Sequence, residues 1–194
     1  MPLTPVKVAR QHIHARQITC NGYLRDDGDW DIEGCLTDKK SYSFPNIDRG
    51  QVAAGEPVHE MYIRITVTTQ LLIKDIEATT DNGPFQICNN ITASFHKLIG
   101  TQIKPGFQKE LYRHLGGTKG CTHHTDLLKS MATTAIQTIF PYLARQEALT
   151  KRDDKKSRPN MHQLNQCHAY ATDGELVRTR WPELYNGKDE TDKK

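Results

Sequence analysis

The stretch HEMYIRITVTTQLLIKDIEAT (residues 59–79) decides the fold. In its first nine residues apolar and polar side chains alternate, which is the pattern of a β-strand with one buried face. The apolar set is Met61, Ile63, Ile65 and Val67. After the short connector TTQ the run LLIKDIEAT returns as a second strand, so the stretch predicts a β-hairpin. His59 lies on the same strand face as this apolar set and extends the buried face toward the start of the strand.

Two more hairpins are predicted, one on either side of this stretch. Between Arg10 and Lys39 two extended runs flank DDGD, a cluster of turn-forming residues. Near the C-terminus, CHAYATDGELVRTRWP has the pattern of a last hairpin about Asp173 and Gly174. We expect the three hairpins to form one antiparallel sheet.

Three helical segments are predicted between the second and third hairpins. DNGPFQICNNITASFHKLIG predicts a turn and a helix, and GFQKELYRHLGG predicts a short helix that its glycines end. The longest lies within GGTKGCTHHTDLLKSMATTAIQTIFP (residues 116–141), where apolar residues recur at helical spacing and Pro141 is expected to terminate the helix. The fold class is therefore α+β, an antiparallel sheet of β-hairpins packed on one side by helices.

The composition fits one globular domain. The chain has 194 residues, of which 36% are hydrophobic and 25% charged, so we expect a single α+β domain over residues 1–185 and a disordered tail over residues 186–194. No apolar run could span a bilayer and the N-terminus lacks a secretory signal, which predicts a cytoplasmic protein without a membrane partner. The net charge of +3 is spread among interspersed acids and bases, so nucleic acid is not an expected partner.

The cysteines are five in number and widely scattered: Cys20, Cys35, Cys88, Cys121 and Cys167. Their odd number and the lack of a CxxC pair favour reduced thiols, and leave metal binding or catalysis open. Cys121 stands where a glycine-rich segment enters the long helix, and there the unpaired backbone N–H groups and the helix dipole favour a thiolate. Burial as a small apolar residue is the alternative.

Three residues at the ends of separate elements predict a metal site. Cys121 opens the long helix, Cys88 lies where the NGPF turn enters a helix, and His59 lies at the mouth of the central hairpin. Sulfur and imidazole ligands suit zinc or iron, with the fourth position open or filled by His123. We therefore predict a site of His59, Cys88 and Cys121, against the alternative that all three are buried structural residues.

The first hairpin offers a substrate-binding pair. His14 and Arg16 fall on one strand face, and a buried histidine and arginine there could hold a carboxylate or a phosphate. The acids of RDDGD are too few for a calcium loop and are explained by turn chemistry. LGGTKG lacks the GK[ST] of a P-loop.

Motifs that recur among related bacterial sequences cover nearly the whole chain: HARQI, GYLRDDGDWDIEGCLTDKK, AGEPVHEMYIRITV, PFQIC, LIGTQIKPGF, GGTKGCTH and CHAYATDGELV. On these the chain is identified as a member of a bacterial domain-of-unknown-function family, which supplies no activity. Residues 55–140 also resemble in layout the iron–sulfur scaffold proteins of the NifU/IscU type, which implies a similar core. By position, His59, Cys88 and Cys121 match the three cysteines of the scaffolds. Met61 stands where the scaffolds have an aspartate, and LGGTKG replaces their LPPVK chaperone-recognition stretch.

Together these features predict a metal-binding domain whose zinc or iron ion keeps an open position. Such an ion suits a metal-assisted hydrolase or lyase acting on a small-molecule substrate. A non-enzymatic metal or iron–sulfur carrier is the first alternative, which the missing aspartate and LPPVK stretch disfavour. The second alternative is a metal-free hydrolase or lyase in which Cys121 is the nucleophile and His123 its base. The substrate, the metal and the oligomeric state, including a homo-oligomer, stay open.

Overall fold

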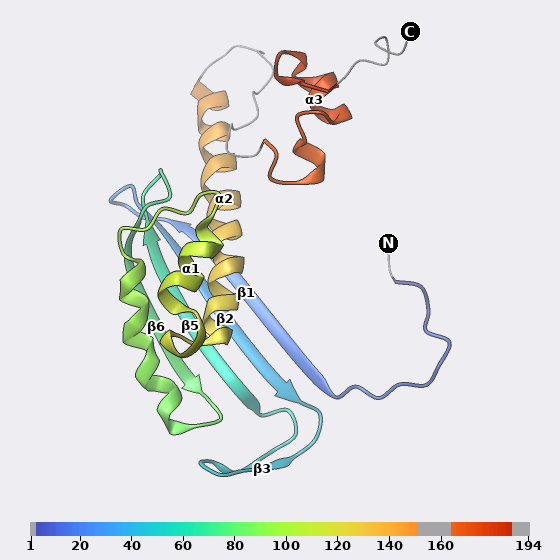
Figure 1. Ribbon diagram of the computed structural model, residues 1–194, viewed down its shortest axis with the longest axis vertical. Coiled ribbons are helices and arrows are strands. Elements are labelled where there is room, and N and C mark those ends of the chain that lie inside the picture. Colours follow the sequence, from blue (N-terminus) through green and yellow to red (C-terminus); the bar gives the residue numbers. More distant parts are fainter. Residues whose placement is uncertain (1–2, 151–163, 188–194) are drawn as a thin grey trace. The chain divides into compact units, whose positions relative to one another are not determined.

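The computed structural model describes residues 3–150 and 164–187 (Figure 1). The chain divides into two compact units, the first ending at Ile139 and the second beginning at Phe140. The expectation of a single domain over residues 1–185 stays a prediction. Most of the predicted disordered tail lies outside the described residues.

The first unit is built on a four-stranded antiparallel sheet with the strand order β1-β2-β5-β6. The first hairpin consists of β1 (His14–Leu24) and β2 (Trp30–Lys40), and the second of β5 (Pro57–Val67) and β6 (Ile73–Asn82). The connection between the hairpins carries a two-stranded ribbon of β3 (Phe44–Asn46) and β4 (Gly50–Val52). The first two predicted hairpins and their antiparallel sheet are confirmed.

Helical segments follow the sheet in the sequence. They are η1, a 3-10 helix (Gln86–Leu98), α1 (Phe107–Leu115), the short η2 (Gly117–Lys119) and α2 (Thr122–Thr150). In the first unit α1 and the first part of α2 lie over one face of the sheet (Figure 1), so the α+β class with helices packed on the sheet is confirmed. Among the described residues, no helix has both the length and the apolar character needed to cross a membrane.

The expected end of the long helix at Pro141 is wrong, because α2 continues through Pro141 to Thr150. Proline removes one intrahelical hydrogen bond and costs about 3 kcal/mol in a helix interior. The following YLARQEAL is rich in strong helix formers, which favour continuation of the helix after Pro141.

The predicted last hairpin is also wrong. The second unit has the 3-10 turns η4 (His168–Tyr170) and η5 (Pro182–Leu184) and, between them, the helix α3 (Glu175–Arg180). Gly174 is the N-cap of α3 and Glu175 stands in its first turn, where an acid favours a helix start. An Asp-Gly pair therefore occurs both in hairpin turns and at helix starts, and does not by itself distinguish the two.

Alternation along β2 and β5 buries one face of the sheet, as predicted. The buried residues are Trp30, Ile32 and Leu36 of β2 and Met61, Ile63, Ile65 and Val67 of β5. Gly34 lets α2 approach this face, since an added Cβ there would lie 2.7 Å from Met131 Sδ and 2.9 Å from Leu127 Cδ1. This close packing holds the first turn of α2 above the sheet.

Strand register determines which side chains lie side by side. At one end of the covered face Leu24, Trp30 and Val67 form a row across β1, β2 and β5. At the other end the corresponding row is Arg16, Asp38 and His59. The same face is therefore apolar at one end and ionisable at the other.

Candidate metal centre

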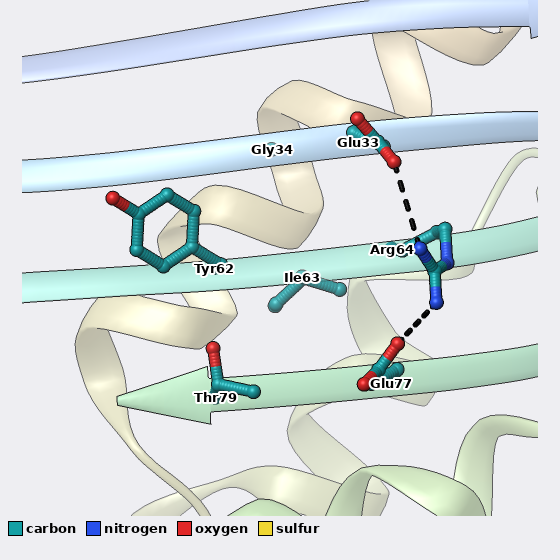
Figure 2. A pocket seen from close by; sticks show the side chains of 7 residues that line it. All are labelled: Glu33, Gly34, Tyr62, Ile63, Arg64, Glu77 and Thr79. Carbon is teal, nitrogen blue, oxygen red and sulfur yellow. Dashed lines mark hydrogen bonds and ion pairs between the residues drawn. The ribbon is translucent and has the colours of Figure 1, made fainter. Parts of the chain in front are cut away.

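Two places on the sheet gather polar side chains. The first is a hollow on the solvent-facing side of β2, β5 and β6 (Figure 2), where Arg64 forms ion pairs with Glu33 and Glu77. Its charged groups thus pair with one another, which is ordinary for the solvated face of an antiparallel sheet. The second is the ionisable row on the covered face, and it is the candidate site.

Asp38 lies at the centre of this site, with a side chain that is only 2% exposed. Arg16 donates from Nε to Oδ1 and from Nη2 to Oδ2, each over 2.8 Å, and His14 Nε2 lies 3.0 Å from Oδ1. Two oxygens offer about four lone-pair positions, so these three donors leave one position, on Oδ2. Burial favours the protonated form, but the hydrogen bonds and charge of Arg16, with the bond from His14, still hold the pKa of Asp38 below its usual value.

Two imidazoles face the remaining lone pair. His59 Nδ1 lies 3.1 Å from Asp38 Oδ2, and His123 Nε2, from the first turn of α2, lies 3.5 Å from the same oxygen. The two rings stack with centroids 3.8 Å apart. The direction from His59 Nδ1 to Asp38 does not suit a hydrogen bond, so this buried nitrogen has no hydrogen-bond partner among the described residues.

Both imidazoles are held in the neutral form. Burial, followed by the proximity of His123, lowers the pKa of His59 to about 4, although the charge of Asp38 acts in the opposite direction. Burial and then the charge of Arg16 also lower the pKa of His123. Neutral imidazole is the form that binds metal ions.

The geometry fits a small divalent ion. One ligand atom each from Asp38, His59 and His123 can be chosen so that all lie within 4.8 Å of one another, and across the described ranges this is the one such group of three. Bonds of roughly 2.0–2.2 Å in a tetrahedral site place neighbouring ligand atoms about 3.3–3.6 Å apart. The two separations from Asp38 Oδ2, 3.1 and 3.5 Å, lie close to this range.

The cysteines predicted as ligands lie outside this group. Cys121 precedes α2, where its backbone carbonyl accepts a hydrogen bond from the backbone N–H of Thr125 over 2.9 Å, and its Sγ lies 3.9 Å from His123 Nδ1. It therefore faces the ring nitrogen that points away from Asp38. Cys88 lies on η1, where an added Cβ at Gly83 would be 3.4 Å from its Sγ. Binding of metal by these two thiols stays a prediction.

The other residues singled out in the sequence have clear positions. His14 and Arg16, predicted to bind substrate, both contact Asp38, and Arg16 Nη1 also lies 3.5 Å from Asp126 Oδ2. His123, predicted as a base, stands between Cys121 and Asp38. Substrate binding and catalysis by these residues stay predictions.

Asp38 is the residue that the sequence reasoning missed. It continues the alternation of Trp30, Ile32 and Leu36, so its parity places it on the buried face of β2. A carboxylate at a buried strand position is rare unless it is paired. That parity was the signal in the sequence that could have identified it.

Comparison with known proteins places the chain in a family. The matching family model is described as "Protein of unknown function (DUF2889)" and covers residues 14–137. The protein belongs to this family, which confirms the domain-of-unknown-function assignment made from the sequence. All the residues of the candidate metal centre lie within the matched range. No curated protein and no solved structure matches the chain. The finer likeness to NifU/IscU scaffolds stays a prediction.

Proposed function

We propose that this protein is a metal-binding domain whose ion is held by Asp38, His59 and His123. One observation carries the proposal: a single lone pair of Asp38 Oδ2 is faced by two ring nitrogens, at 3.1 and 3.5 Å. The nearer of the two, His59 Nδ1, is buried and has no hydrogen-bond partner among the described residues. A cation at this point would be bound by all three groups at once.

The neighbours of the three ligands support the same assignment. Arg16 and His14 orient the carboxylate of Asp38, and Cys121 lies beside the second nitrogen of His123. Metal-binding side chains are usually held in this way by outer partners that fix their direction and tautomer. These contacts would prepare the site before the ion arrives.

The ligand set indicates the class of metal and of chemistry. Two imidazoles and one carboxylate suit zinc or iron(II) and leave at least one position for water or a substrate oxygen. When bound, such an ion would supply Lewis-acid activation for a hydrolase or lyase acting on a small molecule. The burial of Asp38 and His59, whose side chains are 2% and 16% exposed, favours a resident ion over a carrier's cargo.

Metal titration of the purified apoprotein tests the proposal. We expect about one equivalent of Zn²⁺ or Co²⁺ to bind, with the visible absorption of Co²⁺ reporting nitrogen and oxygen ligands. His59→Ala and His123→Ala should each weaken binding by about 100-fold or more. His96→Ala is the matched control, because His96 is exposed on η1 and should leave affinity unchanged. A wild-type protein without a saturable site, or equal affinity in all four proteins, would contradict the proposal.

A second candidate function rests on the separation of 3.9 Å between Cys121 Sγ and His123 Nδ1. With His123 Nε2 turned toward Asp38, the three residues form a line of nucleophile, base and orienting carboxylate. This arrangement supports a metal-free hydrolase or lyase in which Cys121 attacks and its proton passes to His123.

Alkylation of the cysteines separates the two candidates. In chelator-treated protein, an activated Cys121 should react with iodoacetamide faster than Cys167, which is exposed and serves as the internal reference. His123→Ala should abolish this advantage. Labelling of Cys121 that is slower than that of Cys167 and indifferent to His123→Ala would remove the second candidate without affecting the metal proposal.

A further inference from the structure

The two edge strands of the sheet, β6 and β1, differ in how they are protected from pairing with another strand. Along the β6 edge, Ile73 N–H donates to the carbonyl of Thr101 over 3.0 Å and the Ile73 carbonyl accepts from Gly100 N–H over 2.8 Å, and Leu72 forms a β-bridge with Gln102. β6 also has register shifts against β5 and exposed acids at Asp75, Glu77 and Asp81. Coverage, bulges and charge are the usual protections of an edge strand.

In the described structure the β1 edge lacks coverage and bulges, and Arg16 is its one permanently charged side chain. β1 is 11 residues long and pairs with β2 without a register shift, and its sequence HARQITCNGYL contains no proline, lysine or acid. Ten of its residues are exposed, among them Ile18, Tyr23 and Leu24 at 37%, 48% and 48%. Within the described part of the chain, no backbone hydrogen bond reaches the side of β1 that faces away from β2. A long, flat edge of this kind is a template for another strand.

We propose that β1 pairs antiparallel with β1 of a second copy of this chain, joining two sheets into one of eight strands. A two-fold axis makes such an interface self-complementary. The register that overlaps all of β1 places Thr19 on the axis. It also keeps each side chain on the face it occupies in the single chain.

The side chains are compatible in this register. Arg16 would stand opposite Gly22 of the second copy, so the permanent charge of the strand meets no like charge. On the solvent face Gln17 would stand opposite Asn21, which can pair as amides, and Ala15 opposite Tyr23. These pairings bring no like charges together.

Charge complementarity extends beyond the strand. Residues 3–13, before β1, contain Lys7 and Arg10 and no acid. In an antiparallel pair they run toward the other copy's β1–β2 turn, where Asp26 and Asp27 are exposed; Asp27 is paired with Arg25, so the attraction rests on Asp26. This attraction favours a second copy over a partner of unrelated charge.

The helices leave room for the second copy. An added Cβ at Gly22 of β1 would overlap Thr138 of α2, and one at Gly34 of β2 would overlap Met131, so α2 lies above both strands. If α2 lies midway between these two strands, strands about 4.8 Å apart place the two α2 helices at about 10 Å, which is a normal packing distance.

Sedimentation of the full chain with two pairs of variants tests the proposal. Wild type should be a dimer, and Thr19→Lys should weaken it about tenfold or more, because two like charges then face each other at the axis. Thr79→Lys is the matched control, since Thr79 is exposed on β6, at the opposite edge of the sheet. Under mild oxidation Thr19→Cys should form an intermolecular disulfide beyond the wild-type background, and Thr79→Cys should not.

Three outcomes would overturn the proposal. One is a wild-type protein that stays monomeric up to about 100 μM, a concentration at which specific interfaces of standard size are formed. Another is a dimer that neither Thr19 variant affects, because a different surface would then make it. The third is a monomer whose β1 amides are protected from hydrogen exchange, because another part of the same chain would then cover the edge.

Discussion

The two ends of the covered sheet face share one backbone geometry and carry opposite chemistry. At the apolar end Trp30, Ile32, Ile65 and Val67 are at most 2% exposed. At the ionisable end the row of Arg16, Asp38 and His59 occupies equivalent positions on the same strands. Burial of the first set stabilises the fold through apolar contact, whereas burial of the second costs desolvation free energy that its own contacts must offset.

The difference bears on the metal site proposed at the ionisable end. Asp38 is well supplied with donors, but His59 Nδ1 is buried without a hydrogen bond in the described structure, and His59 is held neutral. Incompletely satisfied polar groups of this kind are typical of functional sites. Removing groups from the two ends should therefore have opposite consequences for stability and for metal binding.

The largest effect is expected at the apolar end. Ile65→Ala should lower the free energy of unfolding by about 2–4 kcal/mol, through lost burial and a residual cavity, and leave metal affinity unchanged. Denaturant unfolding and metal titration measure the two quantities. A loss below ~0.5 kcal/mol would show that Ile65 does not belong to the packed core.

Acid should weaken the apoprotein through the ionisable end. The pKa of His59 is about 4 in the folded state and near 6.5 in the unfolded state. Between these values the unfolded chain binds more protons than the folded one, so the free energy of unfolding decreases as the pH is lowered. His59 alone contributes about 3 kcal/mol to this loss. The lowered pKa of Asp38 adds a loss in the same direction only at still lower pH. In the presence of chelator, His59→Gln should lose correspondingly less stability from pH 7 to pH 4 than wild type, and equal losses would contradict the burial of a neutral His59.

A smaller effect is expected from the outer partner of Asp38. Arg16→Lys keeps the charge but removes the two-pronged hydrogen bond to the carboxylate, so metal affinity should fall by about tenfold. Arg113→Lys is the control, because Arg113 pairs with Glu110 on the surface of α1. Unchanged metal affinity in Arg16→Lys would show that Asp38 does not need the two hydrogen bonds of the Arg16 guanidinium to be oriented for metal binding.

The smallest effect is expected at Cys121. If the ion is bound by Asp38, His59 and His123, Cys121→Ser can still contact His123 Nδ1, and metal affinity should change by less than about threefold. If Cys121 is itself a ligand, as the sequence predicted, the same change should remove most of the bound metal. Metal content of the two purified proteins therefore decides between the two ligand sets.

The site could be predicted only in part from the sequence. His59 was predicted as a ligand because its parity and its place at a strand end are local features. Asp38 was missed because its importance depends on lying beside His59 on the next strand of the sheet. His123 and His124 are adjacent in the sequence, yet His123 reaches the site while His124 is buried and has its Nε2 3.0 Å from the carbonyl of Thr79.

The sequence by itself determined the two hairpins, the buried parity of β5 and the start of the long helix. These features depend on alternation, turn residues and helix-start chemistry, which act between near neighbours in the chain. Only the tertiary structure decided that Asp38 and His59 lie side by side and that the first turn of α2 places His123 over them. The physical reason is that strand register and the close packing of α2 at Gly34 are set by the whole sheet, so no local pattern contains them.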